Sequence, residues 1–309
     1  MKRKKKASII ILIVVLLLCF VVSICIAIFL KSSEEVKPSE EVKPSEGLEY
    51  TFDEEQNHYV ITGIGSCEDE HIVIDSIYNG KPVMAIGKEA FRGCNTITSI
   101  VILNGVTTVE DYAFAFCRNL KNINLGSDVT SIGLCAFAAC GNLLEINFAE
   151  KLEFIGERAF YGCSSLAHIS VAENNLNYKS VGGNLYTKDG SKLVQYAIGK
   201  KETIFVIPDE VQYIGKYSIS GCARLTRIEL GKNVKCIGEG AFKYCNALSS
   251  VIISNSVTIM GKYLFGGCSS LTSIAFSGTV EEWNKIQKIT FWGGIPATEI
   301  VCLDGTVAL

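Results

Sequence analysis

The chain has 309 residues, enough for one extended domain or two compact ones. Its formal net charge of −3 conceals an asymmetry, because five of the 29 basic residues lie within residues 1–6 and leave 24 basic residues against 32 acidic ones. Phosphate binding requires clustered Lys and Arg side chains, so this acidic body argues against a nucleic-acid partner.

Residues 7–30 contain no charged side chain and are apolar almost throughout. About 20 such residues suffice to cross a bilayer, whereas a signal-peptide core is usually about 7–15 residues long. The sequence therefore predicts that residues 1–30 are a basic cytoplasmic stub and a transmembrane signal anchor, which places the C-terminal domain outside the cell. The alternative is a long signal peptide that is cleaved, so that the protein is secreted.

Residues 31–46 contain the hexapeptide Ser-Glu-Glu-Val-Lys-Pro twice. A charged, proline-containing repeat cannot bury enough apolar surface to pack. We expect a disordered spacer that holds the folded part away from the membrane.

Residues 83–276 repeat with a period of 23, most clearly in a column of Phe and a column of Cys. The columns are Phe91, Phe114, Phe137, Phe160, Phe242 and Phe265, and Cys94, Cys117, Cys140, Cys163, Cys222, Cys245 and Cys268. Internal repeats of 20–50 residues are typical of solenoids, in which neighbouring repeats bury one continuous core.

Each repeat contains two kinds of apolar pattern. Ala113, Phe114, Cys117 and Leu120 have helical spacing, and the alternation over 122–125 is typical of a strand with one buried face. The sequence thus predicts an α/β solenoid, with a parallel β-sheet on one face and short helices on the other.

The period is interrupted once, after Phe160. Within residues 175–198, Asp189-Gly190 lies between two apolar runs, which is a strong hairpin signal. We expect a protruding β-hairpin that replaces the helix of one repeat.

The pattern over residues 129–148, Val-x-x-Ile-Gly-x-x-Ala-Phe-x-x-Cys-x-x-Leu-x-x-Ile, resembles the BspA-like class of bacterial leucine-rich-repeat surface proteins. The resemblance extends to an N-terminal β cap at 47–82, the hairpin insert and a C-terminal closing cap at 277–309. It implies display on the cell surface and, in some members, adhesion to host or matrix proteins or to other cells. It implies no shared enzymatic activity and no fixed ligand.

The sequence contains no pattern that indicates a catalytic or metal site. A spacing of 23 residues between cysteines does not match a zinc motif, and His58, His71 and His168 form no short cluster with Cys or carboxylates. We expect no metal, no cofactor and no enzyme activity, although an enzyme with unrecognised chemistry is an alternative. We expect the periodic cysteines to be buried free thiols; the alternative is disulfides between neighbouring repeats.

The outward positions of the predicted strands are the candidate partner-binding surface. These positions are Asn122, Asn124, Glu145, Asn147, His168, Ser170, Arg227 and Glu229. The expected partner is a protein or glycan on another cell, in the host matrix or in the envelope, bound through this face or through the hairpin insert. Two alternatives remain: an ordinary solvated face, and a structural envelope or surface-layer protein without a specific ligand.

Overall fold

The computed structural model describes residues 43–288 and 294–309. The chain divides into two units, Met1–Lys43 and Pro44–Leu309, and nearly all described residues belong to the second. The predicted membrane anchor at residues 7–30 lies outside the described part. Within the part that is described, no helix reaches the length and apolarity that a bilayer crossing requires.

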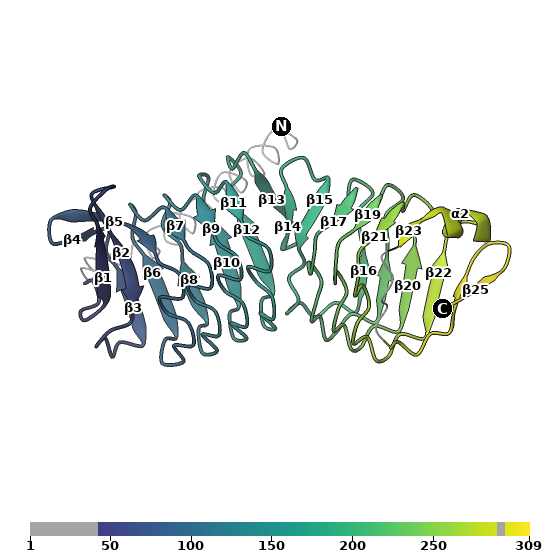
Figure 1. Cartoon of the computed structure of the whole chain (residues 1–309), viewed down its shortest axis with the longest axis horizontal. Helices are drawn as coiled ribbons and strands as arrows, with labels where there is room; N and C mark the ends of the chain where they lie inside the picture. Colours follow the sequence, from purple (N-terminus) through teal and green to yellow (C-terminus); the bar gives the residue numbers. More distant parts are fainter. Residues whose placement is uncertain (1–42, 289–293) are drawn as a thin grey trace, which may run out of the picture. The chain divides into compact units, whose positions relative to one another are not determined.

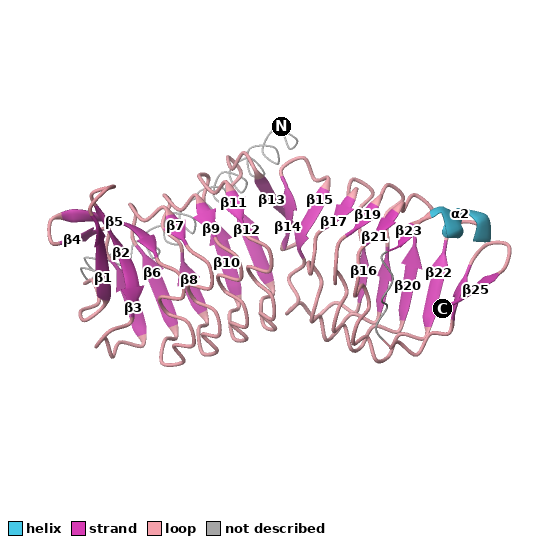
Figure 2. Ribbon diagram, in the orientation of Figure 1, coloured by secondary structure: helices cyan, strands magenta, loops and turns pink. Residues whose placement is uncertain are grey.

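Residues 44–288 and 294–309 form a β-solenoid in which two rows of strands run along the stack (Figures 1 and 2). The long-strand row consists of β3 (His71–Ile74), β6 (Ser99–Ile102), β8 (Asn122–Asn124), β10 (Glu145–Phe148), β12 (His168–Val171), β16 (Ile204–Val206), β18 (Arg227–Glu229), β20 (Ser250–Ile253), β22 (Ser273–Phe276), β24 (Glu299–Val301) and β25 (Thr306–Ala308). The short-strand row consists of β1 (Glu49–Asp53), β2 (His58–Gly63), β4 (Ile77–Tyr78), β5 (Lys81–Ile86), β7 (Thr108–Val109), β9 (Ser131–Ile132), β11 (Phe154–Ile155), β13 (Tyr178–Val181), β14 (Asn184–Thr187), β15 (Lys192–Gln195), β17 (Tyr213–Ile214), β19 (Cys236–Ile237), β21 (Ile259–Met260) and β23 (Gln287–Lys288).

Neighbouring strands within the repeats pair in parallel and in register. Glu145 lies opposite His168 and Asn147 lies opposite Ser170, so each residue pairs with the residue 23 positions later. Because successive side chains point to opposite faces of a strand, Ile146 and Phe148 are buried while Glu145 and Asn147 are exposed.

The core is built from columns of identical side chains. The rings of Phe91, Phe114, Phe137 and Phe160 stack in series, with centroid separations of 5.1, 5.3 and 5.6 Å and interplanar angles below 10°. Offset stacking of this kind adds to the free energy of burial. The Phe column therefore fixes the register of the turns.

The predicted helices in the repeats are wrong, because the structure places consecutive turns there. Tyr112 and Phe116 have φ values of 57° and 64°, which a right-handed helix cannot contain. The N–H of Phe114 donates to the carbonyl of Ala136 in the next repeat at 2.8 Å, not to a carbonyl one turn back. The helix-like spacing of Ala113, Phe114 and Cys117 correctly indicated burial, but the backbone bonds run between repeats, so the fold is a β-solenoid.

The insert is a three-stranded antiparallel meander, β13–β14–β15, and it does not protrude. It continues the short-strand row, since β15 pairs in parallel with β17. Leu185 packs into the core of the N-terminal repeats and Tyr186 into that of the C-terminal repeats. The meander therefore joins two hydrophobic cores. The prediction that the hairpin protrudes from the repeats is wrong, because its strands continue the short-strand row.

The two ends of the solenoid have different structures. At the N-terminal end, β1 and β2 form an antiparallel pair. At the C-terminal end, helix α2 (Val280–Lys285) begins at a capping box formed by Thr279 and Glu282, and β25 pairs antiparallel with β24. Trp283 of α2 is buried against Phe276.

Candidate interaction surface

Six of the eight predicted surface residues lie together on the strands β8, β10 and β12. β8 and β10 are neighbours, since the N–H of Leu144 donates to the carbonyl of Lys121 at 3.1 Å, and β10 pairs with β12. The parallel register produces two rows of side chains: Asn122, Glu145 and His168 in one, and Asn124, Asn147 and Ser170 in the other.

The polar side chains of this face are largely uncommitted. Ser170 is half-buried, and its hydroxyl donates to the carboxamide oxygen of Asn147. Within the described residues, no hydrogen bond or ion pair engages the side chains of Asn122, Asn124 or Glu145, and all three are exposed. Such side chains can exchange water for a partner without breaking an internal bond.

A shallow hollow of 470 Å³ adjoins the second row at the carboxyl ends of β6, β8 and β10. Its polar lining includes Asn104, Asn124 and Asn147, and its apolar lining includes Leu125 and Phe148. The carboxamide oxygen of Asn104 accepts the N–H of Ser127 at 2.9 Å, which orders the adjoining loop. We refer to the two rows and this hollow together as the Asn face.

Arg227 and Glu229 do not belong to the Asn face. They lie on β18, in a separate sheet, and pair with each other at 2.7 Å between Nε and Oε1. The long-strand row is interrupted before that sheet, because the far edge of β12 is occupied by the meander: the N–H of Ile169 donates to the carbonyl of Gly183 at 3.0 Å. Arg227 and Glu229 are therefore separated in the sheet order from the other six candidate positions.

The long-strand face of the C-terminal repeats also exposes apolar side chains. Ile204 and Val206 of β16 are 54% and 58% exposed, and Val301 of β24 is 48% exposed. The alternation around Phe205 was the signal that these residues face outward.

The cysteines of the described part are free, so the disulfide alternative finds no support there. The thiols of Cys117, Cys140 and Cys163 each donate to a Phe carbonyl of an earlier repeat, at 3.0–3.1 Å. Among the described residues, no group of three or more His, Cys, Asp and Glu side chains is placed to hold a metal ion.

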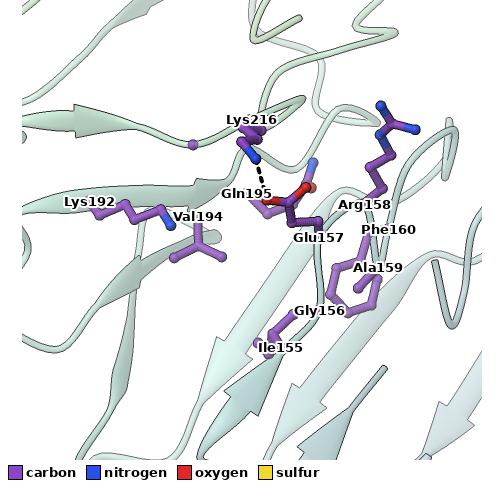
Figure 3. Close-up of a pocket in the computed structure, with 11 residues that line it drawn as sticks. Ile155, Gly156, Glu157, Arg158, Ala159, Phe160, Lys192, Val194, Gln195 and Lys216 are labelled. Carbon is purple, nitrogen blue, oxygen red and sulfur yellow. Dashed lines mark hydrogen bonds and ion pairs between the residues drawn. The ribbon is translucent and has the colours of Figure 1, made fainter. Parts of the chain in front are cut away.

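A pocket of 130 Å³ that was not predicted from the sequence lies between the turn after β11, the strand β15 and the residues that follow β17 (Figure 3). Lys216 and Glu157 meet across it, with 2.7 Å between Nζ and Oε1, and this contact raises the pKa of Lys216. Lys192 adds a further positive charge to the lining, whereas the guanidinium group of Arg158 is directed away, over the ring of Tyr217. The break in the 23-residue period was the only sequence signal for this site.

The comparison with protein families agrees with this repeat architecture. The sequence profile of the BspA type leucine rich repeat region matches residues 84–201 and 195–301, in six copies. No curated protein sequence matches the chain.

Two solved structures resemble the fold. A leucine-rich repeat protein from Eubacterium ventriosum is 20% identical, with a TM-score of 0.53 over 83% of this chain and 84% of that one. The pneumococcal vaccine antigen PcpA is 19% identical, with a TM-score of 0.51 over 85% of this chain and 87% of that one. At these identities the likeness concerns the fold alone.

Proposed function

Because the chain belongs to the BspA-type leucine-rich-repeat family, we propose that it is a cell-surface interaction protein that binds a protein or glycan through the Asn face. The observation that carries the proposal is the pair of exposed polar rows on β8, β10 and β12, which lie beside a hollow. Solenoids present extended faces of this kind to their partners.

The composition of the face favours a polar partner surface. Asn side chains each offer a donor and an acceptor, so the rows can match the hydroxyls of a glycan or the backbone of a peptide. Leu125 and Phe148 border the hollow, but their side chains are buried in the core, so the surface that a partner would meet is predominantly polar. Leucine-rich-repeat proteins generally act as scaffolds for binding, and we propose no catalytic role.

The sequence supports a particular arrangement on the cell. We propose that residues 1–30 anchor the chain in the membrane, that residues 31–46 serve as a spacer, and that the cap at 47–82, the repeats at 83–276 and the cap at 277–309 lie outside. The 24 uncharged positions of residues 7–30 support this arrangement.

Display and binding are tested separately on cells that carry the full chain. Protease added to intact cells should cleave the domain, whereas protection that disappears on lysis would show that it is not displayed. Cells are then bound to immobilised matrix proteins, glycans and envelope polymers.

The Asn face is tested with a double variant, Asn124→Ala with Asn147→Ala. For any partner in the panel, we expect the affinity to fall about tenfold, or about 1.4 kcal/mol. Asn246→Ala is the matched control, because Asn246 is exposed in a turn outside the face. Unchanged binding by the double variant would exclude the Asn face as the binding site.

A further inference from the structure

The turns of successive repeats are joined by backbone hydrogen bonds that stop at one place. The N–H of Phe91 donates to Ala113 O, that of Phe114 to Ala136 O and that of Phe137 to Ala159 O, at 2.8–2.9 Å. In the C-terminal repeats the series continues from Ile219 to Ala241 O at 3.0 Å. At Phe160 it is interrupted: within the described residues, the N–H groups of Arg158 and Phe160 have no hydrogen-bond acceptor.

These two N–H groups face the pocket of Figure 3. The carbonyls of Glu157 and Ala159 accept bonds from the preceding repeat, so the alternating N–H groups of Arg158 and Phe160 point the other way along the stack. On that side the chain enters the meander instead of forming another turn, and the pocket occupies the space. Phe160 is 1% exposed, and a buried N–H without an acceptor costs about 1–3 kcal/mol.

Two lysines, Lys192 and Lys216, line the pocket together with one carboxylate, Glu157. Arg158 also belongs to its lining, but its guanidinium group is directed away and lies over the ring of Tyr217, 3.8 Å from the centroid. Figure 3 shows the carboxylate of Glu157 and the ammonium group of Lys216 directed toward each other and joined by an ion pair. Both side chains are more than half exposed, so this ion pair contributes little to stability and can be exchanged for another anion.

We propose that this pocket binds a small oxyanion, held by the N–H groups of Arg158 and Phe160 and by the ammonium group of Lys216. Neighbouring free backbone N–H groups beside a cationic side chain are a general way to bind phosphate, sulfate or a terminal carboxylate. A volume of 130 Å³ is well below the roughly 300–1,000 Å³ of pockets for larger ligands, so the occupant is an ion or a terminal group. Glu157 acts as a built-in competitor that the oxyanion displaces from Lys216.

The site is separate from the Asn face and would act at the junction of the two cores. An anion there would supply the acceptors that the interrupted turn lacks, and would connect the turn after β11 to the segment that begins with Lys216. Occupancy should therefore stabilise the folded chain, and the free energy of unfolding should rise with the logarithm of the anion concentration once that concentration exceeds the Kd.

The test uses the full-length chain in detergent, titrated with inorganic phosphate, sulfate or acetate at constant ionic strength set by chloride. NMR follows the backbone amide of Phe160, and calorimetry gives the affinity. We expect a saturable shift of the Phe160 amide with at least one of the three anions. Shifts that chloride reproduces, or no shift with any of them, would overturn the proposal and leave water as the occupant.

Two variants should change the affinity for the anion in opposite directions. Glu157→Gln removes the competitor and should tighten binding about fivefold, whereas Lys216→Gln should weaken it about fivefold. Lys232→Gln is the control, because Lys232 forms a comparable exposed pair with Asp209 at 2.8 Å outside the pocket. Equal affinity in all three variants would overturn the proposal, and circular dichroism establishes that each one is folded.

Discussion

The thiol of Cys140 donates to the carbonyl oxygen of Phe114 at 3.1 Å, across two successive repeats. The same bond recurs from Cys117 to Phe91 and from Cys163 to Phe137. The Phe114 carbonyl also accepts the N–H of Cys117 within its own turn at 3.3 Å, so a cysteine at this position fills a small apolar space and adds a second, inter-repeat bond to a carbonyl already bonded within the turn. Serine could donate the same bond, but its hydroxyl is more costly to bury.

The first prediction concerns the reactivity of these thiols. Burial raises the pKa of Cys163 and of Cys268 to about 12, so both remain protonated and shielded at pH 8. In a titration with a thiol-specific disulfide reagent, we expect the buried column to react only after denaturation. Reaction of these cysteines in the folded chain would show that they are not buried. Failure of these cysteines to react after denaturation without reductant would show that they are not free thiols.

The second prediction concerns stability at high pH. The folded pKa of Cys163 lies near 12 and its ordinary value is 9.0, so above pH 9 the unfolded chain loses a proton that the folded chain retains. The unfolded state then binds fewer protons, and the free energy of unfolding falls as pH rises from about 9 to 12, by up to about 1.4 kcal/mol per pH unit for one such thiol. In urea unfolding from pH 8 to 11, the free energy of unfolding should decline less steeply with pH for Cys163→Ala than for the unaltered chain. Leu166→Ala, a change at an equally buried neighbour without a titratable group, should lower stability but keep the original slope.

The repeat architecture was predictable because side-chain burial follows the sequence period directly. Phe114, Cys117 and Leu120 are all buried as expected, and Ile123 lies between the exposed Asn122 and Asn124. The conformation between these positions was not predictable from apolar spacing. A turn with left-handed residues and a two-turn helix bury the same side chains, and only the direction of the backbone bonds distinguishes them.

The positions of the candidate surface residues were predictable where the 23-residue period is intact. They were not predictable where that period is interrupted. Asn124 and Asn147 adjoin because both lie in consecutive repeats, and their position follows from the alternation of a strand. Arg227 was assigned to the same surface, but the sequence does not reveal that the meander occupies the edge of β12. The approach of Glu157 and Lys216, which are 59 residues apart, likewise depends on how the meander folds.

The third prediction tests the left-handed turns. Ala139 has a φ of 60°, which costs an L-residue roughly 1–2 kcal/mol but costs glycine little. Ala139→Gly should therefore raise the free energy of unfolding by about 0.5 kcal/mol. Ala138→Gly is the matched control, since Ala138 does not have a positive φ, and it should lower stability by about 1 kcal/mol. Urea unfolding measures both, and a loss of stability in both variants would contradict the left-handed turn at Ala139.

The fourth prediction tests the Phe column. Phe114 is fully buried between Phe91 and Phe137, so Phe114→Ala removes two ring contacts and leaves a cavity that costs about 3–5 kcal/mol. Phe114→Leu fills most of that volume and should cost about 1–2 kcal/mol, which keeps the comparison measurable if the alanine variant does not fold. Phe154→Ala is the control, because Phe154 is 56% exposed and its loss should change stability by no more than about 0.5 kcal/mol. Chemical unfolding of the three variants measures how much each one loses in free energy of unfolding. Similar losses for Phe114→Ala and Phe154→Ala would show that the stacked rings do not form the core of the repeats.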